Sequence, residues 1–123
     1  MTADWIGKTK GLRASVPDVM KAFSGLAQAA LQPKTLDTKT KELIALAISV
    51  AVRCDDCIAF HAKAAVDQGA SSDEILETLG MAIYMGAGPS VMYAAHALEA
   101  CKQFAKKSEG VVTAAKPKSD EGG

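Results

Sequence analysis

The feature that most constrains the fold is a nearly unbroken apolar segment, Leu43 to Val52, within the run LDTKTKELIALAISVAVR. Asp37 precedes the run and is a suitable helix N-cap. Its β-branched residues would also suit a strand, but the length of the run, its alanines and the start signal favour a helix. A helix that is apolar on most sides must be buried. We therefore expect a central helix covered by other helices.

Further segments with helical spacing lie on both sides of this central helix. The first runs from Val16 to before Pro33, and the others follow the sequences CIAFHAKAAVDQG, SSDEILETLGMAIYMG and PSVMYAAHALEACKQFAKK. Gly69 is a suitable C-terminal position, and Pro89 can open the last helix. Ser71 or Ser72 can cap the helix between them, and Glu74 completes a capping box if Ser71 is the cap. The sequence predicts an all-α domain of five to six helices over residues 16–107. Residues 1–15 are expected to form an arm or short helix, and 108–123 a flexible tail.

Composition narrows the classes of partner. Lysine plus arginine equals aspartate plus glutamate, at 14 each, so no net field attracts nucleic acid or an anionic membrane. The first residues resemble no signal peptide, and no segment reaches the roughly 20 apolar residues of a membrane span. We therefore expect a cytoplasmic protein whose partners are small molecules or proteins. Only 5% of residues are aromatic, so small residues are expected to form close helix contacts within and between subunits.

A Cys-x-x-Cys pair, Cys54 and Cys57, follows the central helix, and His61 lies four residues after the second cysteine. Cytosolic thiols are normally reduced, so such a pair indicates a catalytic or metal-binding site before a structural bridge. Residues four apart on a helix share a face, which brings His61 within reach of Cys57. Cys54 is about 10 Å from His61 along an ideal helix. Cys57 is therefore the thiol that His61 can activate.

This arrangement predicts thiol redox chemistry. A free thiol has a pKa of about 8.5, which falls near a helix N-terminus or a cationic histidine. A Cys57 thiolate could attack a peroxide to give a sulfenic acid, which Cys54 would condense to a disulfide. An external dithiol would then reduce the pair by exchange.

Two other readings of the pair are weaker. A structural zinc site normally needs four ligands, and only Cys54, Cys57 and His61 are clustered. Haem attachment needs histidine directly after the second cysteine, where this chain has Ile58. We expect no metal and no cofactor. Glu42 could pair with His61 if the two helices pack antiparallel, or it could be an exposed residue near Lys39.

The spacing of Glu42, Cys54-Asp55-Asp56-Cys57 and His61 resembles the signature of the AhpD-like alkylhydroperoxidase branch of the carboxymuconolactone decarboxylase family. The resemblance extends over residues 36–100. It implies an all-helical fold assembled as a homo-trimer or homo-hexamer, with sites near subunit contacts. It also implies a Cys54–Cys57 redox pair served by a His61–Glu42 proton relay, with hydroperoxides as substrates and a dithiol or a thioredoxin- or lipoyl-type protein as reductant.

One position departs from that resemblance. The best-studied peroxidase members have a histidine before the second cysteine, where this chain has Asp56, and a nearby carboxylate disfavours a thiolate. This motivates a second hypothesis, an oligomeric redox-sensing or interaction protein with little turnover. Decarboxylase members lack the cysteine pair, which argues against lactone chemistry. Among the remaining residues, His96 is expected to be packed or on the surface, and Cys101 to be inert core.

Overall fold

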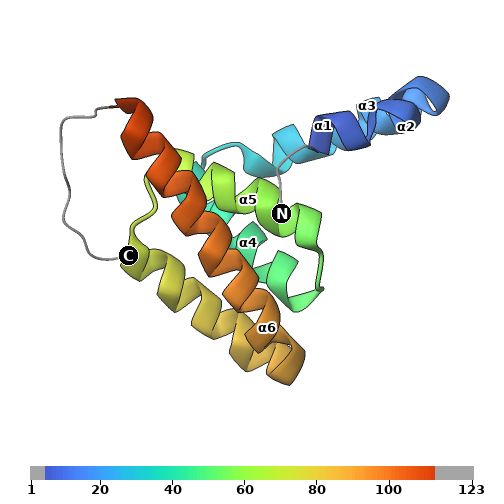
Figure 1. The fold of residues 1–123 in the computed structure, drawn as a ribbon. Helices are drawn as coiled ribbons and strands as arrows, with labels where there is room; N and C mark the ends of the chain where they lie inside the picture. Colours follow the sequence, from blue (N-terminus) through green and yellow to red (C-terminus); the bar gives the residue numbers. More distant parts are fainter. Residues whose placement is uncertain (1–4, 113–123) are drawn as a thin grey trace.

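The structure is a computed structural model that describes residues 5–112, and those residues are helical with short connections. Figure 1 shows the helices in chain order. Their bounds are α1 (Trp5–Lys8), α2 (Lys10–Ser15), α3 (Pro17–Leu31), α4 (Thr38–Ala51), α5 (Asp55–Asp67) and α6 (Ser72–Val112). The predicted all-α fold is confirmed.

The core lies where α4, α5 and the two halves of α6 pack together. Leu46 and Val50 of α4 and Ile58 of α5 are fully buried there, against Leu79 and Ala97 of α6. Much of the rest of the core is alanine, because small side chains let helix backbones approach closely. The apolar segment identified in the sequence is therefore the central element that the other helices cover.

Helix α6 consists of two helical halves, and the chain folds back between them (Figure 1). The break falls at Ala87, whose φ of 60° and ψ of −148° are not helical, two residues before Pro89. Gly86 is required there for a different reason: a Cβ on this residue would collide with the side chain of Ser90 and lie 3.5 Å from Cα of Ala51. Gly86 therefore lets the fold-back pack closely against the end of α4.

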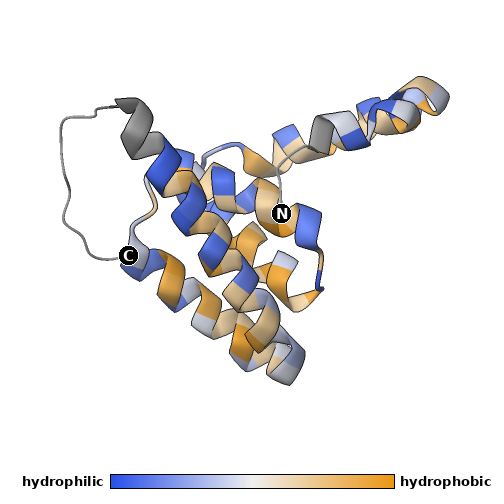
Figure 2. Cartoon of the chain, in the orientation of Figure 1, coloured by the Kyte–Doolittle hydropathy of each residue, from blue (hydrophilic) through white to orange (hydrophobic). Residues whose placement is uncertain are grey.

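The helices α1, α2 and α3 form an arm that projects from the bundle (Figure 1). Helix α3 has the predicted position and Pro17 in its first turn, but it contains no buried residue. Its apolar side chains Val19, Phe23 and Leu26 are between 51% and 64% exposed. Figure 2 shows hydrophobic segments along this arm as well as in the bundle. Among residues 5–112, nothing buries the apolar face of α3, which stays more than half exposed.

Side-chain caps fix the starts of α4 and α6. Asp37 Oδ1 accepts the Thr40 N–H at 2.8 Å, and the hydrogen bonds with Thr40 lower the pKa of Asp37. Ser71 and Glu74 form the predicted capping box, with N···O distances of 2.9 and 3.1 Å. Lys39 Nζ lies 2.8 Å from Glu74 Oε2, which raises the pKa of Lys39, lowers that of Glu74 and joins the two helix starts.

The segment expected to be a flexible tail, residues 108–123, begins within helix α6. Helix α6 continues as far as Val112, five residues past the expected boundary at Lys107. The remaining residues of the expected tail, 113–123, lie outside the described residues, as do residues 1–4 of the expected N-terminal arm.

Candidate redox site

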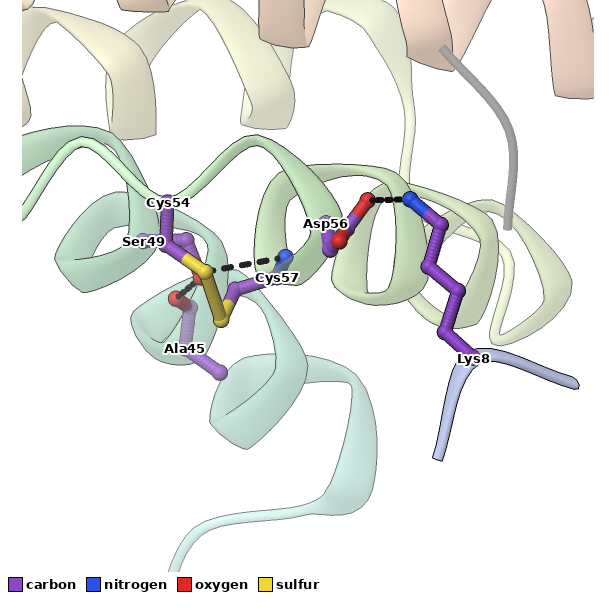
Figure 3. The surroundings of a disulfide bond; sticks show 6 residues. All are labelled: Lys8, Ala45, Ser49, Cys54, Asp56 and Cys57. Carbon is purple, nitrogen blue, oxygen red and sulfur yellow. Dashed lines mark hydrogen bonds and ion pairs between the residues drawn. A yellow bond between two sulfur atoms is a disulfide. The ribbon is translucent and has the colours of Figure 1, made fainter. Parts of the chain in front are cut away.

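Cys54 and Cys57 form a disulfide at the junction of α4 and α5 (Figure 3). Cys54 is the N-cap of α5, and its Sγ accepts the backbone N–H of Cys57 at 3.2 Å. Cys57 lies in the first turn of that helix. The free N–H groups of a helix start stabilise negative charge, so this position favours a thiolate when the pair is reduced.

The backbone that leads into Cys54 is fixed by the end of α4. The N–H of Cys54 donates to the carbonyl of Ser49 at 3.0 Å, and the N–H of Arg53 donates to that of Val50 at 3.1 Å. These two bonds form a Schellman motif, which needs a left-handed residue before its last position. Arg53 takes this conformation, with φ of 60°, where glycine is usual. Cys54 is therefore both the last residue of the Schellman motif that ends α4 and the N-cap of α5, so both helices set its position.

His61 and Glu42 are brought together by the packing of α5 against α4. His61 Nδ1 lies 2.7 Å from Oε1 of Glu42. Glu42 is only 5% exposed, so the alternative in which it is an exposed residue near Lys39 is wrong. Phe60 packs its ring edge-on to His61, with centroids 5.1 Å apart. The imidazole is thus held at Nδ1 by a buried carboxylate, while its side chain stays 23% exposed.

The two carboxylates between the cysteines each have a cationic or imidazole partner. Asp56 Oδ1 lies 2.8 Å from Nζ of Lys8, from the arm (Figure 3). Asp55 Oδ1 lies 3.2 Å from Nδ1 of His96, from the second half of α6. Both carboxylates are in the first turn of α5, where the helix dipole favours negative charge. Their charges are therefore partly offset from two directions.

His96 lies at the edge of the site, and the sequence did not predict this position. Its side chain is 44% exposed, and its ring packs edge-on against Tyr93 at 5.3 Å between centroids. A surface position was among the expectations, but its contact with the cysteine turn was not. That contact depends on the fold-back of α6 at Ala87, and no local sequence pattern signals it.

The third cysteine lies apart from this chemistry. Cys101 is 3% exposed in the core, and burial raises the pKa of its thiol to about 11. It is therefore a neutral, shielded thiol. Among residues 5–112, no group of at least three His, Cys, Asp or Glu side chains is arranged to hold a metal ion. None of the helices in this range is long and apolar enough to cross a membrane.

The fold and the cysteine turn define a class of protein. Residues 17–100 match the carboxymuconolactone decarboxylase family, and the chain belongs to this family. A solved Legionella pneumophila member is similar, with 52% identity and a TM-score of 0.80 over 85% of this chain and 93% of that one. A Thermotoga maritima member, for which an antioxidative role has been suggested, has 31% identity and a TM-score of 0.72 over 86% and 97%.

A relative from Haemophilus influenzae, described as uncharacterized, is 40% identical over 107 residues, which is 81% of this chain and 95% of the relative. The resemblance to the AhpD-like branch of the family is confirmed at the level of the fold and the family. The assignment of chemistry therefore depends on the site itself.

Proposed function

We propose that this protein is a thiol-dependent peroxidase and disulfide oxidoreductase that reduces organic hydroperoxides. The Cys57 thiolate attacks the terminal oxygen of ROOH, and the O–O bond breaks to give Cys57 sulfenic acid and an alkoxide that takes up a proton. The Cys54 thiol then condenses with the sulfenic acid, releasing water and forming the Cys54–Cys57 disulfide. A dithiol reductant restores both thiols by two exchange steps and becomes a disulfide itself.

The observation that carries this proposal is the pairing of His61 with Glu42 one turn beyond Cys57. Residues 57 and 61 share one face of α5, about 6 Å apart along its axis. With Nδ1 held by the Glu42 carboxylate, the other ring nitrogen can accept the Cys57 proton and later return a proton to the leaving alkoxide. Cys57 thus attacks the hydroperoxide, and Cys54 resolves the sulfenic acid. His61 transfers the proton, and Glu42 orients His61.

Steady-state reduction of cumene hydroperoxide with dihydrolipoamide as reductant tests the proposal. The Cys57→Ser variant is expected to lose turnover, and Cys54→Ser to stop at the Cys57 sulfenic acid after one equivalent of hydroperoxide when no dithiol is added. Cys101→Ser is the matched control, because this thiol is buried in the core, and it should retain turnover. Full turnover by Cys57→Ser would show that the mechanism is wrong.

A second candidate function is a redox sensor that oxidises once and turns over poorly. The specific observation behind it is Asp56, a carboxylate directly before Cys57 that is 47% exposed and so only partly shielded. The two functions differ in one comparison: a sensor forms the disulfide stoichiometrically with peroxide but shows no sustained consumption when reductant is in excess. A thioredoxin- or lipoyl-type protein would be its physiological reductant in either case.

We also propose that the protein assembles as a homo-trimer or homo-hexamer through the uncovered face of α3. The supporting observation is the row of Val19, Phe23 and Leu26, whose side chains are each more than half exposed in the described part of the chain. Light scattering at micromolar concentration should show an oligomer, and Phe23→Glu should shift it towards smaller species. Lys21→Glu, at an exposed position of the same helix, is the matched control. A monomeric wild-type protein would contradict the proposal.

A further inference from the structure

An ion pair that spans 48 residues of sequence joins the arm to the cysteine turn. Lys8, the last residue of α1, places Nζ 2.8 Å from Oδ1 of Asp56. Asp56 stands directly before Cys57, and the two paired side chains are 52% and 47% exposed. Figure 3 shows the Lys8 side chain extending to Asp56, with Asp56 between Lys8 and the disulfide in this view. A residue of the arm therefore lies within the electrostatic surroundings of the redox pair.

The charge of Asp56 matters only when the cysteines are reduced. A carboxylate next to Cys57 disfavours its thiolate, and an ammonium group on that carboxylate removes most of this effect. Other charged or titratable groups around the turn are Asp55 of α5 with His96 of α6, His61 of α5 with Glu42 of α4, and Arg53, which directly precedes Cys54. In this set Lys8 is the ammonium partner of the carboxylate adjoining Cys57.

We propose that Lys8 is a positioning residue of the redox site, which offsets the Asp56 charge and so maintains the Cys57 thiolate. The inference deepens the proposed function and rests on its assignment of Cys57 as the reactive thiol. Coupling of this kind is reciprocal: if Lys8 favours the thiolate, the thiolate favours the docked position of Lys8. The arm is therefore held more firmly in the reduced protein than in the disulfide form.

The size of the effect follows from the exposure of the pair. Two unit charges about 4 to 10 Å apart in water-like surroundings change an ionisation equilibrium by roughly two- to fivefold. Salt weakens the interaction, because the Debye length falls from about 10 Å at 0.1 M to about 3 Å at 1 M. Both the magnitude and the salt dependence separate this role from a purely structural one.

The test is the rate of alkylation of Cys57 by iodoacetamide at pH 7, measured without peroxide in the Cys54→Ser background. Lys8→Gln is expected to slow alkylation about threefold at low salt and by less at 1 M salt. Asp56→Asn should speed it, and Lys8→Gln should have no further effect once Asp56→Asn is present. Lys8→Arg should retain the rate, and Lys10→Gln, on the exposed start of α2, is the matched control.

Two outcomes would overturn the inference: an unchanged rate in Lys8→Gln, or an equal slowing in the presence and absence of the Asp56 carboxylate. The reciprocal effect is checked by hydrogen exchange of the arm, which should be slower in reduced than in oxidised protein, with the difference lost in Lys8→Gln. Neither measurement uses turnover. If the coupling is found but hydroperoxide is not consumed, the proposed peroxidase function fails while the role of Lys8 stands.

Discussion

Nδ1 of His61 lies 2.7 Å from Oε1 of Glu42, across a separation of 19 residues and the interface between α5 and α4. Glu42 is buried on the central helix, while His61 is partly exposed on the helix that carries the cysteines. A buried carboxylate is costly unless it is paired, so the contact stabilises the interface as well as orienting the imidazole. Packing and chemistry therefore depend on the same pair.

The Glu42→Gln variant tests this double role. The glutamine side chain would keep the size of the original and an oxygen acceptor for the Nδ1–H of His61, but it would lose the negative charge that supports proton uptake by the ring. We expect hydroperoxide turnover to fall by roughly 10- to 100-fold, within the range typical of lost acid–base assistance. Steady-state rates at saturating dithiol measure the effect.

Glu77→Gln, at an exposed position of α6, is the control for a lost carboxylate and should retain the wild-type rate. The pH profile separates orientation from simple loss of structure, because a merely destabilised enzyme would keep the shape of its profile. An unchanged rate in Glu42→Gln would remove Glu42 from the relay.

Cys54 is expected to contribute to stability as a helix cap even when it is reduced. Its Sγ accepts the N–H of Cys57, which serine at this position would also do and alanine would not. Cys54→Ala should therefore be less stable than Cys54→Ser by about 1 kcal/mol, the usual value of an N-cap. Urea denaturation of both variants under reducing conditions measures the difference. Equal stabilities would show that the side chain at position 54 has no capping role.

The helical architecture could be predicted from the sequence because its signals are local. The caps at Asp37 and Ser71, the stop at Gly69 and the break before Pro89 depend on residues within a turn of each other. The coverage of α3 could not be predicted in this way. An apolar stripe on Val19 to Leu26 predicts that something covers it, but its spacing does not distinguish the chain's own bundle from a second copy.

The site likewise could be predicted only where it depends on residues close together in the sequence. The nearness of Cys57 and His61 follows from helical spacing, whereas the contact of Glu42 depends on how two helices pack. The contacts of Lys8 and His96 with the cysteine turn depend on distant parts of the chain, the arm and the fold-back of α6. Such contacts leave no periodic pattern, so the sequence alone assigned neither residue to the site.

Cys101 is expected to be unreactive in the native protein. Burial raises the pKa of its thiol from the ordinary 9.0 to about 11, so at pH 8 it is neutral as well as shielded. After reduction, Ellman's reagent should modify two thiols rapidly and the third only when the protein is unfolded. Cys101→Ala should abolish the slow phase and leave the fast phase unchanged, whereas a fast third thiol would contradict the burial of this side chain.

The same residue makes stability depend on alkaline pH. Between pH 9 and about 11 the folded protein keeps a proton that the unfolded chain has lost, so the free energy of unfolding falls as the pH rises through this range. The contribution is complete below pH 9 and lost above the raised pKa. In Cys101→Ala, urea denaturation over this range should show a shallower decline than in the wild type.

At the fold-back of α6, Gly86 packs against Ser90 and the end of α4. An alanine Cβ at position 86 would collide with the Ser90 side chain, so Gly86→Ala is expected to destabilise the protein by about 1–3 kcal/mol. Gly80→Ala is the matched control, because Gly80 is exposed in the same helix with nothing near its missing Cβ. This change should stabilise by up to about 1 kcal/mol.

The Ser90→Ala variant tests whether the clash, rather than a loss of backbone freedom at position 86, causes the destabilisation by Gly86→Ala. Its Oγ is fully buried and has no hydrogen-bond partner in the described part of the chain, so Ser90→Ala alone should be neutral or stabilising. Combined with Gly86→Ala, it removes the oxygen that the new methyl group would meet and should recover part of the lost stability. Thermal denaturation of the wild type, the two single variants and the double variant completes this double-mutant cycle. Strictly additive effects on stability would exclude the clash as the cause of the destabilisation.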